Sequence, residues 1–242
     1  MTKIKLAVFD LSGTTVNDHN AVANSLWQAA TEAGLEVTLD DFQQSIGTNK
    51  IHMYQYLIAK NNGMQVSLRH LEQYHFPDFY DQAVKLFERY SKIMIDYYQH
   101  HLQAMDGTEE VFDWCRTKDI KIATDTGFHR EINDAIQQGL KWVERQIVDL
   151  AVDIDHVKGI GRPAPFMIFH IMKELNIQSV HEVIKIGDTP ADLYSGFHAG
   201  CKGNIGVLSG ANTEEVLIQH PHTHIINSIL ELPRLIENHF NL

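Results

Sequence analysis

Acidic residues in this chain stand where two apolar runs end. Asp10 closes the first run in the stretch AVFDLSGTTV, and Asp188 closes another in IGDTPADLYSG. Glycine or hydroxylated residues follow each acid at once, and Asp192 comes four positions after Asp188. One such acid alone indicates an ordinary turn. Two of them at one edge of a sheet would provide the hard oxygen ligands that Mg²⁺ prefers.

Two further stretches supply groups that bind anions. Thr126 and Gly127 end the stretch KIATDTG and offer a hydroxyl and backbone amides to phosphate oxygens. Arg162 lies in GRPAP, a proline-flanked segment typical of a loop, where its guanidinium can neutralise a second charge. Lys158, four residues earlier, is the weaker candidate for that cation.

The elements that must position these residues change type along the chain. Residues 4–9 form a short β-rich run, which predicts a buried strand. From about Asn20 to Tyr98 the pattern is helical, with breaks at Gly34, Gly47, 62–63 and Pro77. This stretch is rich in aromatic residues and has almost no strand signal, so we expect a helical insert.

Strands and helices alternate after the insert. We expect strands at 120–124, 147–153, 182–188, 203–208 and 223–229, the last at an edge, and helices at 108–116, 131–140, 165–175, 191–199 and 230–240, the first capped by Thr108. Such alternation predicts an α/β fold, a parallel sheet covered on both faces. Functional sites of these sheets lie at the carboxyl ends of the strands, where Asp10, Thr126 and Asp188 should meet.

Composition excludes several classes of protein. The chain has 242 residues, 44% hydrophobic and 21% charged, with a net charge of −11. This acidity argues against a nucleic-acid partner or an acidic membrane surface. The apolar runs are too short to span a bilayer, and the start MTKIKLAVFD does not resemble a signal peptide. Cys115 and Cys201 form no CxxC pair, so we expect a cytoplasmic protein with reduced cysteines.

Taken in chain order, the stretches around Asp10, Thr126, Arg162 and Asp188 resemble the four motifs of the haloacid dehalogenase-like (HAD) hydrolase superfamily, and the resemblance covers essentially the whole chain. It implies a Rossmann-like, doubly wound parallel sheet as the core domain, residues 1–16 plus 99–242. The helical insert, residues 17–98, stands in the place of the family's cap domain. The implied activity is hydrolysis of a small phosphorylated or phosphonate substrate.

The resemblance also implies a role for each motif residue. Asp10 would be the nucleophile and form an aspartyl-phosphate. Asp10, the backbone carbonyl of Ser12 and Asp188 would hold Mg²⁺, and Asp192 would support its outer shell. Thr126, Gly127 and Arg162 would bind the phosphoryl oxygens. The arginine stands where many members have lysine.

Ser12 departs from the common pattern. Most phosphatases of the superfamily have a second aspartate there, and such an acid/base contributes about 10²–10⁴-fold in rate. The phosphonoacetaldehyde hydrolase (phosphonatase) branch instead has a small residue followed by the same Gly-Thr-Thr-Val run. Its leaving group is a carbanion, which a Schiff base on a cap lysine delocalises.

Lys50, in SIGTNKIHMYQYL, matches the position of that lysine. We expect Gly47 to end one helix and Thr48 to cap the next, with Lys50 in its first turn. Ile46 and Met53 differ from the methionine and histidine usual in phosphonatases.

Three interpretations therefore stay open. Lys50 forms a Schiff base with phosphonoacetaldehyde, or it contacts an anion in a slow phosphomonoesterase. In the third, the chain is a non-catalytic module that binds a phosphoryl ligand. The resemblance is also compatible with a homodimer formed through the cap.

Overall fold

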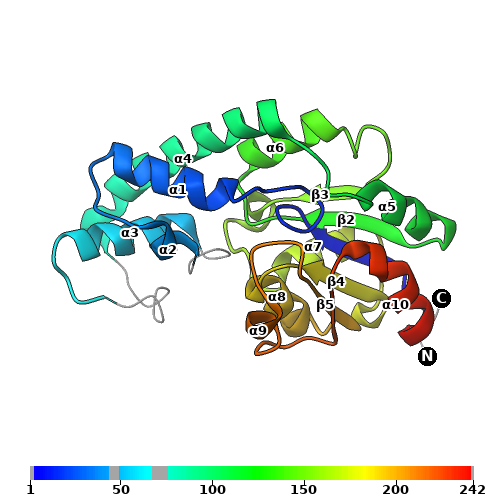
Figure 1. Cartoon of the computed structure of the whole chain (residues 1–242). Helices are drawn as coiled ribbons and strands as arrows, with labels where there is room; N and C mark the ends of the chain where they lie inside the picture. The colour runs from blue at the N-terminus through cyan, green and yellow to red at the C-terminus, as the bar shows by residue number, and fades with distance from the viewer. Residues whose placement is uncertain (1–2, 44–48, 67–75, 241–242) are drawn as a thin grey trace. The chain divides into compact units, whose positions relative to one another are not determined.

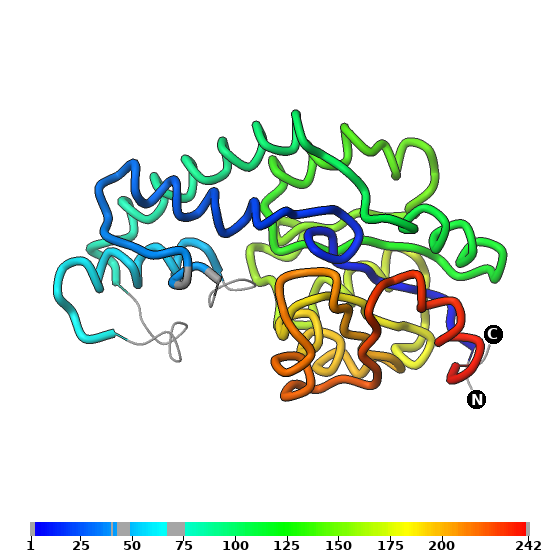
Figure 2. The backbone as a smooth tube through the Cα atoms, viewed as in Figure 1, coloured from blue at the N-terminus to red at the C-terminus, as the bar shows by residue number. Residues whose placement is uncertain are grey.

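The computed structural model describes residues 3–43, 49–66 and 76–240 of the chain (Figure 1). Contacts within the chain divide it into two compact units. We call Met1–His19 with Leu102–Leu242 the core unit, and Asn20–His101 the insert unit. The backbone trace shows the chain leaving the core unit after its first strand and returning to it later (Figure 2).

A parallel sheet organises the core unit. Its strands are β1 (Leu6–Asp10), β2 (Lys121–Asp125), β3 (Leu150–Val152), β4 (Val183–Gly187), β5 (Gly203–Val207) and β6 (His224–Ile226). They lie in the order β3-β2-β1-β4-β5-β6, and every neighbouring pair is parallel. The chain winds outward in both directions from β1, and the carboxyl ends of strands at such a point are where sheets of this kind bind ligands.

Helices cover both faces of this sheet. They are α5 (Thr108–Thr117), α6 (Arg130–Leu140), α7 (Phe166–Glu174), α8 (Pro190–Ala199), α9 (Glu214–Leu217) and α10 (Leu232–His239). Leu6 and Val8 of β1 share a buried cluster with Ile168 of α7. Phe9 projects from the other face, since strand side chains alternate, and its ring lies 5.1 Å from that of Phe112 in α5. The predicted α/β, doubly wound class is confirmed.

Several predicted element boundaries were wrong, including that of the strand expected at 223–229, which ends at Ile226. The strand expected at 147–153 begins only at Leu150, because the amides of Ile147 and Val148 donate to the carbonyl of Trp142 in a turn. Thr108 does not cap α5: Gly107 precedes the helix with φ 79°, and Thr108 is its first residue. The Thr108 hydroxyl instead donates to the Thr15 carbonyl at 3.2 Å.

The described part of the insert unit is helical, as predicted. It contains α1 (Ala21–Glu32), α2 (Leu39–Gln43), α3 (Lys50–Asn61) and α4 (Tyr80–His101). Short 3₁₀ turns occur at Pro77–Phe79 here, and at Ile154–Val157, Val180–Glu182 and Ile229–Glu231 in the core unit. Helices α1 and α3 pack against α4. The buried Tyr54 hydroxyl of α3 donates to the Leu26 carbonyl of α1 at 3.2 Å, which ties these helices together.

Two predictions from composition can be compared with the structure. Among the described residues, no helix has both the length and the apolar character needed to cross a membrane. Cys115 is buried and Cys201 is half-buried, and both are free thiols.

Candidate active site

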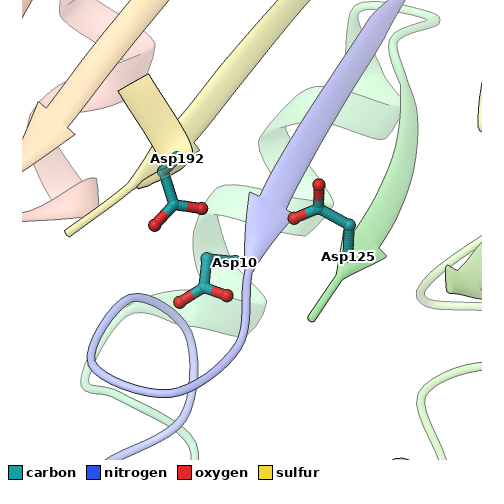
Figure 3. A group of neighbouring side chains, drawn as sticks. All are labelled: Asp10, Asp125 and Asp192. Carbon is teal, nitrogen blue, oxygen red and sulfur yellow. The ribbon is translucent and has the colours of Figure 1, made fainter. Parts of the chain in front are cut away.

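The carboxyl ends of β1 and β2 bring two acids together. Asp10 and Asp125 are the last residues of their strands and lie opposite each other in the register. Asp192 reaches the same place from the first turn of α8, and Figure 3 shows the three carboxylates gathered around the end of β1. One oxygen from each lies within 4.8 Å of the others, and all three side chains are buried.

The start of α8 fixes the position of Asp192. Thr189 is the N-cap: its hydroxyl donates to Asp192 Oδ2 at 2.6 Å and accepts from the Asp192 amide at 3.3 Å. This reciprocal capping box satisfies donors that a helix start otherwise leaves open. Gly187 is required beside it, because a Cβ at that position would lie 2.2 Å from Asp192 Cγ.

Arg162 provides the cation that the sequence predicted, and it contacts the candidate nucleophile directly. Its side chain is only 8% exposed. Nη1 donates to Asp10 Oδ1 at 2.7 Å and also contacts Asp192 Oδ1. The same nitrogen lies 3.9 Å from Asp125 Oδ1.

Lys185 is a second buried cation, and sequence reasoning missed it. It lies in the middle of β4, and its Nζ is 2.8 Å from both Asp125 Oδ1 and Asp192 Oδ1. The signal was present, because a lysine between Ile184 and Ile186 interrupts an otherwise apolar strand. A charged side chain is almost never fully buried unless it is paired. Asp125 was missed as well, although it follows a predicted strand directly.

Asp188 follows β4 and is enclosed by two loops. Its Oδ1 accepts from the Thr14 hydroxyl at 3.2 Å, and its Oδ2 accepts from the Ala211 amide at 2.7 Å. Gly13 and Gly210 approach closely, and a Cβ at Gly210 would lie 2.0 Å from Asp188 Oδ2. These contacts leave the carboxylate fixed at the same sheet edge as Asp10.

The pKa values show where negative charge is in excess. Burial raises the pKa of Asp10 well above its usual value against the attraction of Arg162, and repulsion from Asp192 and Asp188 adds to the rise. Burial and repulsion from Asp192 raise the pKa of Asp188 to about 6. Although burial opposes it, Arg162 and Lys185 hold the pKa of Asp192 at about 2. Burial, helped by like charge nearby, therefore disfavours the ionised forms of Asp10 and Asp188, whereas Asp192 stays ionised beside its two cations.

This donor set fits a divalent cation. Four buried carboxylates, Asp10, Asp125, Asp188 and Asp192, meet two buried cations, Arg162 and Lys185, which leaves two negative charges. Both oxygens of Asp192 already accept hydrogen bonds, and Asp125 Oδ1 is paired with Lys185. Carboxylate oxygens are the hard ligands that Mg²⁺ prefers, so this excess of buried acids over buried cations suits such an ion.

The candidate phosphate loop lies beside Arg162. A Cβ on Gly127 would be 3.5 Å from Arg162 Nη2, so this glycine and the arginine are neighbours. Thr126 is buried, and its amide donates to the Val152 carbonyl at 3.0 Å in the continuation of the sheet. That amide is therefore committed to the fold, and the Thr126 hydroxyl accepts from the Phe128 amide at 3.2 Å.

Ser12 belongs to the core unit, and Lys50 belongs to the insert unit. The Ser12 hydroxyl, in the turn after β1, donates to Asp18 Oδ1 at 2.7 Å. Lys50 is the first residue of α3 in the insert unit and is half-buried. The cap of α3 is Asn49, whose side chain accepts from the amides of Ile51 and His52 at 3.0 and 3.1 Å.

This cap corrects the prediction that Thr48 would start the helix. Asn49 has the extended backbone and the short acceptor side chain that an N-cap needs. Gly47, Thr48 and Ile46 lie outside the described residues. The prediction that Lys50 occupies the first turn is confirmed.

Comparison with known proteins decides the family. The family model described as haloacid dehalogenase-like hydrolase matches residues 7–205, which include every core motif residue discussed above. The chain belongs to this family. The HAD resemblance inferred from the four motifs is thus confirmed, and so is the expectation of a hydrolase.

Two relatives and three solved structures illustrate the position of the chain within the HAD family. Phosphonoacetaldehyde hydrolase of Bacteroides fragilis is 27% identical over 241 residues, covering 96% of this chain and 88% of the relative. That of Bacillus cereus is 29% identical over 217 residues, covering 87% and 78%.

The solved structures share the fold. A hydrolase from Pseudomonas syringae superimposes with a TM-score of 0.78 at 18% identity, covering 97% of this chain and 99% of its own. A phosphonoacetaldehyde hydrolase-like protein from Oleispira antarctica gives 0.78 at 19% identity, covering 98% and 92%. A protein from Lactobacillus delbrueckii, described as a phosphoglycolate phosphatase, gives 0.76 at 22% identity, covering 97% and 99%.

Proposed function

We propose that this chain is a Mg²⁺-dependent hydrolase that transfers a phosphoryl group from a small metabolite to Asp10 and then to water. The observation that carries the proposal is the buried ion pair between Arg162 Nη1 and Asp10 Oδ1, 2.7 Å apart at the carboxyl end of β1. Phosphoryl transfer depends on positioning and on neutralising charge, and this site has groups for both.

Each residue of the site has its own role in this reaction. Asp10 attacks phosphorus and forms an aspartyl-phosphate, while Arg162 orients Asp10 and neutralises the transferred group together with Gly127 and the Thr126 hydroxyl. Asp10, the Ser12 carbonyl and Asp188 would hold Mg²⁺, and Asp192 would act from outside the ligand shell. The bound ion supplies positive charge at the phosphoryl oxygens and keeps Asp10 ionised. The insert unit would serve as the cap domain.

Phosphonoacetaldehyde is the leading substrate, because the curated relatives carry that activity in their names and Ser12 cannot act as a carboxylic acid. Lys50 would condense with the aldehyde and release water. As the Asp10–phosphorus bond forms, the carbon–phosphorus bond breaks, and its electron pair passes into the iminium on Lys50. The resulting enamine takes a proton and is hydrolysed to acetaldehyde, and water then releases phosphate from Asp10.

A slow phosphomonoesterase is the second candidate. It is favoured by the structural likeness to the protein described as a phosphoglycolate phosphatase. In that case Lys50 would be an anion contact, and esters would release phosphate with Mg²⁺ while phosphonates would not. Membership in a family of hydrolases makes a purely binding role the weakest of the three interpretations.

Turnover of phosphonoacetaldehyde by wild type, Lys50→Arg and Lys60→Arg tests the choice. Lys60 lies in the same helix, but its Nζ is paired with Asp41 at 2.7 Å, which makes it a matched control. We expect Lys50→Arg to lower kcat on the order of 10²-fold or more, Lys60→Arg to match wild type, and borohydride to trap a substrate adduct on Lys50. Undiminished turnover in Lys50→Arg would exclude the Schiff base.

Asp10→Asn separates catalysis from ligand binding. With Mg²⁺ and a generic aryl phosphate, wild type should release phosphate, and the variant should lose at least about 10⁴-fold in kcat because the nucleophile is gone. Absence of phosphate release from both the aryl phosphate and phosphonoacetaldehyde would contradict the phosphohydrolase proposal.

A further inference from the structure

The centre of β4 contains a charged side chain that the proposed reaction does not use. Lys185 has no exposed surface, and every residue of β4 is buried. Its three donors all have acceptors: Asp125 Oδ1 at 2.8 Å, Asp192 Oδ1 at 2.8 Å and the Ile186 carbonyl at 3.1 Å. An ammonium group has three donors and no acceptor, so these contacts satisfy it completely.

The contacts of Lys185 lead to the nucleophile through one shared oxygen. Asp192 Oδ1 accepts from both Lys185 and Arg162, and the Arg162 nitrogen that contacts it also donates to Asp10 Oδ1. Lys185 thus draws Asp192 toward β4, and Asp192 in turn holds Arg162 against Asp10. A buried carboxylate that loses one of two cationic partners is left strongly uncompensated.

The charge of Lys185 also sets the balance of the cluster. Four buried carboxylates face Lys185 and Arg162, so two negative charges remain, which one divalent cation neutralises. Without Lys185, a third negative charge would remain. Asp125 Oδ2 is buried and has no hydrogen-bond partner in the described structure, so an unpaired acceptor already lies next to the lysine.

We propose that Lys185 is a positioning residue that directs Arg162 toward Asp10 through Asp192, and whose charge limits the carboxylate cluster to one divalent cation. This inference rests on the proposed metal-dependent function. It assigns Lys185 a sign-specific effect on cation binding, which a residue needed only for packing would lack.

A series of charge variants tests it, with Mn²⁺ as the probe and calorimetry and electron paramagnetic resonance as readouts of affinity and stoichiometry. Lys185→Met should bind Mn²⁺ roughly tenfold more tightly or take a second ion, since unit charges interact strongly in a buried site. Asp125→Asn should bind roughly tenfold more weakly. The double variant should return to the affinity of wild type, and kcat should fall in Lys185→Met.

Lys121→Met is the matched control. This lysine begins the neighbouring strand β2, is exposed, and donates to the Leu175 carbonyl at 2.9 Å. The Lys121→Met variant should bind Mn²⁺ with the same affinity and stoichiometry as wild type. If Lys185→Met does not fold, Asp125→Asn and the double variant still report the charge effect.

The outcomes separate the two proposals. If wild type binds one Mn²⁺ and no charge variant differs from it, or if Lys185→Met binds more weakly, the inference about Lys185 is overturned and the metal site stands. If wild type itself binds no Mn²⁺, the metal-dependent function fails and the inference fails with it.

Discussion

Gly187 and Gly127 lie at the same sheet edge, but they differ in the space available for a side chain. A Cβ on Gly187 would overlap the Asp192 carboxyl group at 2.2 Å, whereas on Gly127 the nearest atom is 3.5 Å away, an ordinary contact. The close approach at Gly187 lets α8 start directly against β4. The two glycines therefore form a matched pair for a substitution experiment.

We expect Gly187→Ala to lower the free energy of unfolding by about 1–3 kcal/mol, because the buried Asp192 must move away from its partners. Gly127→Ala should change it by less than about 0.5 kcal/mol. Urea unfolding of both variants measures the difference. Equal stabilities would mean that Asp192 relaxes freely at no cost.

At the scale of elements, α5 is held to the sheet by a chain of aromatic rings. The Phe112 ring meets Phe9 of β1 at 5.1 Å and Trp142 at 5.3 Å, both edge to face. Trp142 is buried, and its indole nitrogen donates to Glu109 Oε1 at 2.8 Å. Edge-to-face pairs add to the free energy already gained by burying the rings. These contacts support β1 directly below Asp10.

Phe112→Ala should therefore destabilise the protein by about 3–5 kcal/mol, the usual cost of a large cavity in a core. Phe169 of α7 is 41% exposed and serves as the control, and Phe169→Ala should cost no more than about 0.5 kcal/mol. Thermal or urea unfolding compares them. A large loss at Phe169 would show that the face of α7 is covered in solution.

At the scale of the whole molecule, metal binding and pH should be linked. The pKa of Asp188 is raised to about 6 by burial and by Asp192, so without a cation this group favours folding more as the pH falls toward 6 and below. A divalent cation relieves the same repulsion and competes with the proton. Saturating Mg²⁺ should therefore stabilise the protein most above about pH 7.

At neutral pH, Mg²⁺ at 100 times its Kd should stabilise the protein by roughly 3 kcal/mol and raise its Tm. We predict that this rise in Tm becomes smaller as the pH falls through about 6. Differential scanning fluorimetry across this range, with and without Mg²⁺, measures it. Asp188→Asn is the control and should show little response to Mg²⁺. A rise in Tm that is the same at acidic and neutral pH would contradict the assignment of Asp188.

The sequence alone determined three features. They are the succession of strands and helices along the core unit, the position of the acids at the carboxyl ends of strands, and the family. These follow from local signals: the hydrophobic period and motifs whose members lie close together in the chain. It also placed Lys50 in the first turn of its helix, although the cap is Asn49 and not the expected Thr48.

The tertiary structure alone decided which charges meet. Lys185 and Asp125 are 60 positions apart, and only the pairing of β1 with both β2 and β4 brings them together. A buried lysine is tolerated where carboxylates surround it, and no local pattern reveals partners that distant strands supply. The charge balance around Asp10 is for that reason a property of the folded sheet.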